Sequence, residues 1–226
     1  MKLEDKTILV TGSTGNTGPE VTDSLIEEGA RVIGTYHSEE GMESARKRAE
    51  KSEEVIYRKV ELTNPEGLES LKKEIEDKIG KVDCIVNLVG GFTGGGLKNT
   101  EAAQVRSSFE RHVITVFLTV KTFSDHIEEK GGSIVNFVSE KVIEPEPGAV
   151  SYTVGKGALN TLTKVLTKEM ENSRINAIAP TTINVKPNRE RRPNADFDDW
   201  TKPSEVVETI LFLLSNEAVN GQTIRL

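Results

Sequence analysis

The sequence has little of several features that would narrow its class. Among its 226 residues there is one cysteine, which excludes a disulfide within the chain. That residue, Cys84, lies in the apolar run Val82–Val89, so we expect a buried, unreactive thiol rather than a nucleophile. No run approaches the roughly 20 apolar residues that a membrane-spanning helix needs, and no signal-peptide-like apolar segment follows the first residues. We therefore expect a cytoplasmic protein without a membrane partner.

The chain also has no excess of basic over acidic residues. Lys and Arg number 29 against 36 Asp and Glu, which gives a formal net charge of -7. Because nucleic-acid binding depends on a basic surface, we expect no nucleic-acid partner, and we predict no metal site. Hydrophobic residues at 35% and charged residues at 29% are typical of a globular protein with a core. The length suits one domain that covers residues 1–226.

Short apolar runs alternate with helical patterns along the whole chain. Strands are predicted at Thr7–Thr11, Arg31–Tyr36, Val55–Leu62, Val82–Val89, Ser133–Ser139, Arg174–Ala179 and Thr223–Leu226. Helices are predicted at Pro19–Glu28, Gly41–Lys51, Glu66–Ile79, Glu101–Glu129, Val150–Glu171 and Val206–Leu214. The polar, proline-bearing segment Thr181–Lys202 is predicted to be a loop. This order predicts an α/β fold, a Rossmann-like doubly wound parallel sheet of about seven strands with helices on both faces.

A glycine-rich turn joins the first predicted strand to the first predicted helix. Glycines there let the backbone approach a pyrophosphate closely, and the helix N-terminus adds unpaired N–H groups and the positive end of its dipole. A tight turn without a ligand is the alternative, but the strand–turn–helix context favours nucleotide binding. The predicted contacts are Gly12, Ser13, Thr14, Gly15, Asn16, Thr17 and Gly18.

A second motif pairs a tyrosine with a lysine. Tyr152 and Lys156 lie four residues apart in a predicted helix, so both side chains share one face. A phenol with a reference pKa near ~10 is a poor proton donor or acceptor at neutral pH, but a nearby ammonium lowers that pKa. Ser139 ends a predicted strand, at the sheet edge where ligands bind in open α/β folds. An isolated pair of this kind is more often a solvated helix face, so the interpretation depends on the rest of the chain.

Together these motifs resemble the short-chain dehydrogenase/reductase family, almost from end to end. The likeness extends to Asn87-Leu-Val-Gly90, Asn176–Pro180 and Asn220–Arg225, and to the thirteen-residue step from Ser139 to Tyr152. The resemblance implies an NAD(P)H-dependent oxidoreductase that transfers a hydride reversibly between a nicotinamide and a small carbonyl or alcohol substrate.

The family's catalytic roles carry over to three residues of this sequence. By resemblance, Tyr152 is the general acid/base, and Lys156 lowers its pKa and holds the nicotinamide ribose. Ser139 hydrogen-bonds the carbonyl or hydroxyl of the substrate. Members of the family are usually oligomers, so we expect a homodimer or a homotetramer.

The first departure from the family pattern lies in the long central helix. The family often has an asparagine there, which holds a water that connects the lysine to solvent. Here that position is His112. A histidine could anchor a water or relay protons, could block the relay, or could be a packing residue without a role.

The second departure is the spacing of the glycines. The common family form would have glycine at Asn16, and the spacing here is nearer to that of extended and atypical members. Some atypical members bind a dinucleotide without turnover, so a non-catalytic sensor is an alternative. The intact Tyr152 and Lys156 favour an enzyme.

The choice between NADP(H) and NAD(H) depends on the end of the second predicted strand. A carboxylate there would bind the 2′-hydroxyl of NAD and repel a 2′-phosphate. This chain has Tyr36, His37 and Ser38, with no carboxylate before Glu39. Hydroxyls and an imidazole attract a phosphate less than arginine does, yet they favour NADP(H) over NAD(H). The remaining cofactor contacts implied by the resemblance are Glu61, Leu62, Asn87, Gly90, Pro180 and Thr182.

Two segments are candidates for substrate contact. Phe92 lies in the glycine-rich stretch Gly90–Gly96, which is similar to a stretch in dihydropteridine reductases and suggests a quinonoid pterin or quinone as an alternative substrate. A turn without substrate contact is equally open. The second segment, about residues 181–202, is where the family has its substrate lid. Its arginines, Arg189, Arg191 and Arg192, could attract an anion, but a solvated run is the favoured interpretation.

Overall fold

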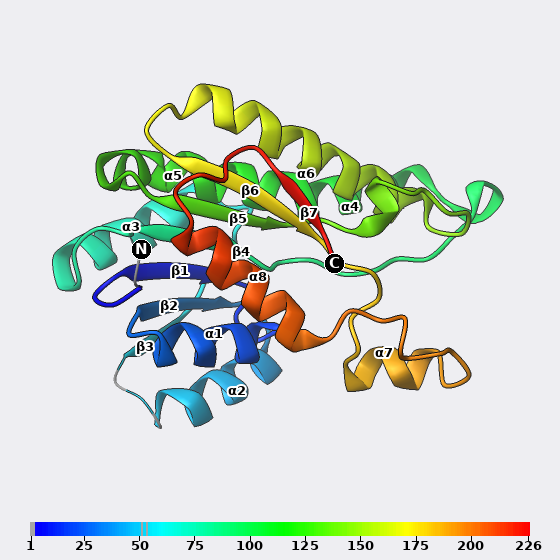
Figure 1. The fold of residues 1–226 in the computed structure, drawn as a ribbon, viewed down its shortest axis with the longest axis horizontal. Helices are drawn as coiled ribbons and strands as arrows, with labels where there is room; N and C mark the ends of the chain where they lie inside the picture. Colours follow the sequence, from blue (N-terminus) through cyan, green and yellow to red (C-terminus); the bar gives the residue numbers. More distant parts are fainter. Residues whose placement is uncertain (1–2, 51, 53) are drawn as a thin grey trace.

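The protein is described here from a computed structural model, which covers residues 3–50, 52 and 54–226. Its strands form one parallel sheet in the order β3-β2-β1-β4-β5-β6-β7 (Figure 1). They are β1 (Thr7–Thr11), β2 (Arg31–Tyr36), β3 (Val55–Lys59), β4 (Cys84–Asn87), β5 (Ser133–Phe137), β6 (Arg174–Ala179) and β7 (Thr223–Arg225). The predicted fold class is confirmed.

Helices cover both faces of this sheet (Figure 1). They are α1 (Gly18–Glu27), α2 (Glu39–Ala49), α3 (Pro65–Lys78), α4 (Ala102–Phe109), α5 (Thr115–Lys130), α6 (Val150–Glu169), α7 (Lys186–Arg191) and α8 (Pro203–Ser215). Helices α3, α5 and α6 pack on one face and α1 and α8 on the other. Along β1, the Leu9 side chain joins the core under α3, α5 and α6. The side chains of Ile8 and Val10 join the core under α1 and α8, because successive side chains of a strand point to opposite faces. A strand covered on both faces therefore carries buried apolar side chains on each of them.

Three strands end two or three residues before their predicted ends. β3 ends at Lys59, β4 at Asn87 and β5 at Phe137, where pairing with the neighbouring strand stops. The residues that follow leave the sheet at its carboxyl edge. Leu62 and Ser139, both predicted to end strands, belong to these departing segments.

The long central helix is interrupted by a π turn. Glu101–Glu129 was predicted as one helix, but α4 and α5 are joined by the π-helical turn Glu110–Ile114. Such a turn inserts one extra residue into the helix and is frequent at functional sites. His112 lies in this turn and is 1% exposed.

The predicted loop Thr181–Lys202 contains a short helix, α7, which the prediction missed. Its sequence carries no apolar periodicity, and its six residues are instead held by local contacts. Pro187 stands in the first turn, where a missing N–H is harmless. The Asn188 side chain donates to the Ile183 carbonyl at 2.9 Å.

Capping residues explain where two other helices begin. α2 starts before the predicted Gly41, because the Ser38 hydroxyl accepts from the Gly41 N–H at 3.0 Å. Its predicted end, Lys51, lies outside the described residues. α8 starts at Pro203 rather than Val206, since proline suits the first helical position.

None of the helices in the described part of the chain is long and apolar enough to cross a bilayer. Within the same residues, no group of three His, Cys, Asp or Glu side chains could hold a metal ion. Cys84 is fully buried, and burial raises the pKa of its thiol to about 11, which makes it a poor nucleophile.

Candidate active site

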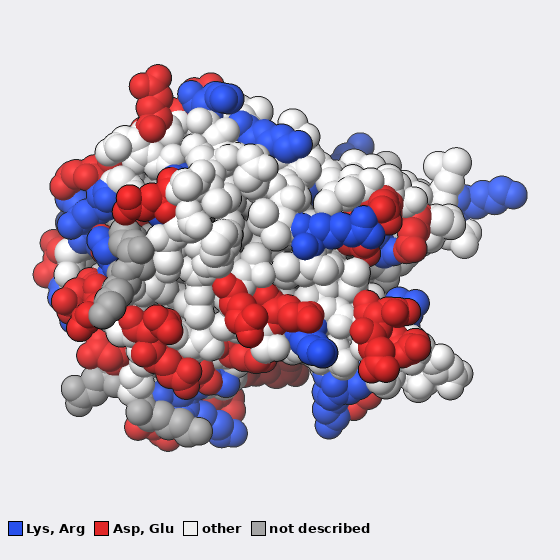
Figure 2. Space-filling view, in the orientation of Figure 1, with Lys and Arg blue, Asp and Glu red and all other residues white. Residues whose placement is uncertain are grey.

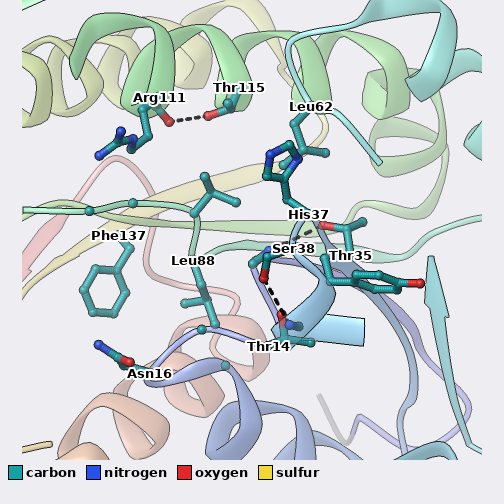
Figure 3. Close-up of a pocket in the computed structure, with 18 of the residues that line it drawn as sticks. Thr14, Asn16, Thr35, His37, Ser38, Leu62, Leu88, Arg111, Thr115 and Phe137 are labelled. Atoms are coloured by element: carbon teal, nitrogen blue, oxygen red, sulfur yellow. Dashed lines mark hydrogen bonds between the residues drawn. The ribbon is translucent and has the colours of Figure 1, made fainter. Parts of the chain in front are cut away.

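A cleft of about 840 Å³ opens at the carboxyl edge of the sheet (Figure 3). It spans the point between β1 and β4 where the strand order reverses, which is where ligands bind in open α/β sheets. The predicted site residues that line it are Gly12, Thr14, Gly15, Asn16, Thr17, Gly18, Tyr36, His37, Ser38, Glu61, Leu62, Gly90, Tyr152 and Lys156. One cavity therefore brings together segments that are far apart in the sequence.

The glycine turn is held in a shape that only glycine allows. Gly12 has a φ of +67°, and a Cβ there would lie 3.0 Å from the Val89 nitrogen. A Cβ on Gly18 would lie 2.4 Å from the Ser13 carbonyl oxygen. The Ser13 hydroxyl and N–H both donate to the Thr35 carbonyl, at 3.0 and 3.1 Å, so buried Ser13 fixes the turn against β2.

No side chain of the turn caps the start of α1, since Thr17 makes no capping hydrogen bond. The first N–H groups of that helix therefore remain available to an anion. The close backbone packing around Gly12 and Gly18, the uncapped helix and the long cleft together fit a dinucleotide.

One end of the cleft holds a contact between a histidine and a carboxylate that the sequence did not reveal. His37 Nδ1 lies 3.3 Å from a carboxylate oxygen of Glu61, which follows β3. Hydrogen bonds from Thr63, together with the nearby His37, hold the pKa of the Glu61 carboxyl below its usual value. The end of β2 lacks a carboxylate of its own, but the neighbouring strand supplies one.

Tyr152 and Lys156 line the other end of the cleft, and Ser139, which is not part of the lining, forms a hydrogen bond with Tyr152. α6 carries Tyr152 and Lys156, and Ser139 follows β5. The Lys156 ammonium, 2% exposed, donates to the Phe137 carbonyl. Ser139 is 7% exposed and also accepts from the Lys141 N–H at 3.4 Å.

Burial is the largest influence on the pKa values of Tyr152 and Lys156. It raises the pKa of Tyr152 above its usual value, although a hydrogen bond with Ser139 acts in the opposite direction. Burial also lowers the pKa of Lys156 to about 7. The expected lowering of the Tyr152 pKa by Lys156 is therefore reversed here, because the ammonium is turned to a carbonyl and both groups are desolvated.

His112 packs edge-on against Tyr152, with ring centroids 5.5 Å apart. Burial first, then the charges of Lys156 and Arg111, lower the pKa of His112 to about 3, so the imidazole is neutral. Among the residues that the structure describes, no partner reaches its buried Nδ1. A Cβ on Gly90 would lie 3.4 Å from Lys156 Nζ and 3.8 Å from that Nδ1, so glycine leaves a space that both nitrogens border.

A buried chain of hydrogen bonds supports the site from behind. The Thr11 hydroxyl donates to the Asn87 side chain at 3.2 Å, and the Asn87 amide donates to Asn136 at 2.9 Å. Asn136 in turn donates to the Thr163 hydroxyl on α6 at 2.9 Å. Asn87, predicted as a cofactor contact, is 2% exposed and lies behind the cleft lining. Asn136 was not predicted, although an asparagine inside an apolar strand is a usable signal.

The glycine-rich segment after β4 is anchored to the start of α6. Gly95 N–H donates to the Gly148 carbonyl at 2.8 Å, and Val150 N–H donates to the Gly95 carbonyl at 3.0 Å. This anchoring sets Phe92 edge-on against Tyr152, with ring centroids 5.1 Å apart. Phe92 remains 54% exposed, so it borders the tyrosine without sealing it.

The segment after β6 stands apart from the cleft lining. Thr181 and Thr201 close its base, each N–H donating to the other's hydroxyl at 3.0 and 2.9 Å. Pro180 is buried and Thr182 half-buried, and neither lines the cleft; their cofactor contacts stay predictions.

Two of the three arginines in the segment after β6 make contacts within that segment. Arg189 donates to the Asn184 side chain at 2.7 Å. Arg192 lies 5.8 Å from the Trp200 ring centroid. Both contacts agree with the favoured interpretation that these arginines do not bind a ligand.

The sequence pattern of short chain dehydrogenases matches residues 6–196. The chain belongs to the short-chain dehydrogenase family. It is accordingly an NAD(P)-dependent oxidoreductase, and members of this family act on small molecules.

Its relatives within this family span several substrates. The chain is 30% identical over 239 residues to a 3-oxoacyl-(acyl-carrier-protein) reductase of Thermotoga maritima, covering 99% of this chain and 97% of that protein. It is 27% identical to a 7alpha-hydroxysteroid dehydrogenase of Clostridium sardiniense, covering 96% and 89%. The solved structure of L-sorbose reductase from Gluconobacter frateurii, complexed with NADPH and L-sorbose, shares the fold with a TM-score of 0.87 at 21% identity, covering 100% and 97%.

Proposed function

We propose that this short-chain dehydrogenase reduces the carbonyl group of a small molecule with NADPH and catalyses the reverse oxidation of the alcohol. The observation that carries the proposal is that Tyr152 and Lys156 line the same cleft as the glycine turn, with Ser139 hydrogen-bonded to Tyr152. When bound, the nicotinamide supplies or accepts the hydride. The turn of residues 12–18 would hold the pyrophosphate.

Tyr152 is the proton donor for carbonyl reduction. Its raised pKa keeps the phenol protonated at neutral pH, which suits a group that must give a proton to the developing alkoxide. Ser139 donates a hydrogen bond to the same substrate oxygen and so positions it. In the direction of oxidation, the tyrosine must first lose its proton, and the raised pKa works against that step.

Lys156 and His112 form the path that returns a proton to Tyr152. The space bordered by Lys156 Nζ and His112 Nδ1 lies beside Gly90 and is lined by polar atoms that can hold a water. A neutral imidazole can accept a hydrogen bond from that water. His112 thus replaces the water-holding asparagine by a different chemical group.

NADP(H) is proposed as the preferred cofactor. The Ser38 hydroxyl and His37 line the adenine end of the cleft and can face a 2′-phosphate. Glu61, which lies beside His37, opposes this preference because its carboxylate repels a 2′-phosphate. The ratio of kcat/KM for NADPH to that for NADH is expected to exceed one and to rise in His37→Arg. A clear preference for NADH in both proteins would contradict the assignment.

Removal of the Tyr152 hydroxyl tests the catalytic assignment. Consumption of NADPH would be screened against carbonyls, quinones and quinonoid pterins, with wild type, Tyr152→Phe and Tyr57→Phe. Because general acid catalysis contributes roughly 10²–10⁴-fold, Tyr152→Phe should lose about that factor in kcat/KM. Tyr57 lies outside the cleft lining and serves as the matched control. Full activity of Tyr152→Phe would refute the mechanism.

The same screen addresses the two alternatives. The edge-on contact of Phe92 with Tyr152 puts an aromatic face beside the site, which would suit a flat quinonoid ring. Turnover of a quinone or pterin in preference to every carbonyl would establish that substrate class. Tight NADPH binding without turnover of any compound would indicate a sensor.

We propose that the protein assembles as a homodimer or homotetramer. Exposed aromatic residues lie at the central helices, where Phe109 and Phe117 are 42% and 41% exposed, and on α8, where Phe212 is 49% exposed. Figure 2 shows an area with few charged side chains near the centre of the face that holds α8 and β7, bordered by acidic and basic groups, and apolar surface of this kind favours association. Sedimentation velocity should give a dimer or tetramer; a monomer at micromolar concentration would contradict it.

A further inference from the structure

The cleft wall opposite the glycine turn carries an arginine that forms no ion pair with any described residue. Arg111, in the π turn, lines the cleft with an exposed side chain. Throughout residues 3–50, 52 and 54–226, no carboxylate forms an ion pair with its guanidinium. An unpaired guanidinium that faces a cavity can bind a carboxylate or phosphate bidentately.

Comparison of the charged side chains that line the cleft shows that an anion is repelled least beside Arg111. The acidic residues of the lining are Glu40, Glu61 and Glu110. Its basic residues are Arg111 and Lys156, and Lys156 is buried against the Phe137 carbonyl. Arg111 is therefore the accessible cation among the described lining residues.

Gly91 determines where the guanidinium lies. A Cβ on Gly91 would stand 2.7 Å from Arg111 Nη1, so the missing side chain lets the arginine lie across the backbone. Gly91 adjoins Gly90, which borders Lys156, and precedes Phe92, which contacts Tyr152. Figure 3 shows the guanidinium turned toward the side of the cleft that holds Phe137, and away from Thr35, His37 and Ser38.

We propose that Arg111 is an oxyanion-binding residue of this cleft, which selects a carbonyl substrate that bears a carboxylate or phosphate group. The inference rests on the proposed reductase function. Because the pyrophosphate of the cofactor has the same chemistry, it is the second possible source of the anion. The glycine turn on the opposite wall already provides for the pyrophosphate, so the substrate is the favoured source.

Binding measurements separate the two sources. The probes are ADP-ribose for the pyrophosphate and, in the presence of saturating NADP⁺, which has no hydride to donate, benzoylformate, with its neutral methyl ester as the uncharged comparison. Dissociation constants would be measured by calorimetry for wild type, Arg111→Met and Arg106→Met. Arg106 is on α4 outside the cleft lining, so its variant makes the same change in net charge.

Arg111→Met is expected to weaken benzoylformate at least tenfold, and to change the affinity for the methyl ester and for ADP-ribose less than twofold. Arg106→Met should change none of the three. A tenfold loss for ADP-ribose instead would assign the residue to the cofactor pyrophosphate. Gly91→Ala, which displaces the guanidinium without removing it, should reproduce part of the benzoylformate effect.

Equal affinities of wild type and Arg111→Met for both anions, or no binding of either anion to the wild type, would overturn the proposal. Failure of the proposed function has a different signature: the wild type would consume no NADPH with any carbonyl, whether charged or neutral. Anion binding is measured without turnover, so the two results remain distinct.

Discussion

Lys156 is buried beside a carbonyl oxygen, and this burial sets both its charge and its effect on stability. Desolvation lowers the pKa of its ammonium to about 7, whereas the unfolded chain keeps a value near ~10.4. Between these two values the unfolded chain binds more protons than the folded protein, so this residue makes stability rise with pH across that window. Below about pH 7 the folded protein carries the full penalty of a buried charge.

Lys156→Met should therefore stabilise the fold, and more at pH 6 than at pH 10, by on the order of a few kcal/mol at the lower pH. Urea unfolding at the two pH values measures the difference. Lys164→Met, an exposed position on the same helix, should show no such dependence. Equal effects of the two variants at both pH values would contradict the burial argument.

His112 is neutral and packs beside Tyr152, and no partner within the described residues reaches its Nδ1. If it holds the water that serves Lys156, an asparagine can do the same, because its amide also hydrogen-bonds a water. His112→Asn should leave kcat unchanged or raise it, whereas His112→Leu should lower kcat by roughly tenfold, with a larger solvent isotope effect. A complete loss in His112→Asn would show that the imidazole does something that an amide cannot.

At the scale of elements, two glycines of α6 distinguish the effect of packing on stability from the effect of helix propensity. A Cβ on Gly155 would lie 2.4 Å from the Ser108 hydroxyl oxygen and 3.1 Å from His112 Cδ2, whereas nothing lies within 4 Å of a Cβ on Gly157. α4 and its π turn therefore approach α6 through Gly155. The close approach is what brings the imidazole to the face that carries Tyr152.

Gly155→Ala should destabilise the protein by about 1–3 kcal/mol through overpacking and lower kcat, since α4 must move away. Gly157→Ala in the same helix should instead be neutral or stabilise by up to about 1 kcal/mol, because alanine has the higher helix propensity. Thermal unfolding and steady-state kinetics of the two variants make the comparison. A stable, fully active Gly155→Ala would show that the contact is not required.

At the scale of the whole molecule, the cleft joins two halves of the sheet. β1 and β2, with the glycine turn, supply one wall, and the segments after β4 and β5 supply the other. A ligand that binds both walls stabilises the native state by about 2.7 kcal/mol at a hundred times its Kd.

NADPH at that concentration should raise the Tm by roughly 5–10 °C for a chain of this length. NADH at the same concentration should raise it less. Differential scanning fluorimetry measures both shifts, with ADP-ribose as a ligand that lacks the nicotinamide. No shift with either cofactor would argue against the cleft as a dinucleotide site.

Local pattern was enough to predict the order of strands and helices, the glycine turn and the shared helix face of Tyr152 and Lys156, whereas the catalytic roles were inferred from the family resemblance. Each of these features is a local sequence pattern: apolar residues at a regular spacing, glycines between a strand and a helix, and a tyrosine and a lysine one helical turn apart. The π turn and α7 were missed because neither has a periodic apolar signature. The strand ends were placed too far along, since pairing with a neighbour, rather than composition, decides where a ladder stops.

By itself, the sequence determined a parallel α/β sheet and a glycine turn between its first strand and first helix, because these follow from periodicity and spacing along the chain, and its family resemblance supplied the candidates Ser139, Tyr152 and Lys156. Only the tertiary structure decided the environment of each group. It moved the pKa of Tyr152 upward, set Glu61 beside His37 and left the Arg111 guanidinium unpaired in the cleft. Desolvation and through-space charge depend on distances between segments that are far apart in sequence, and folding alone fixes those distances.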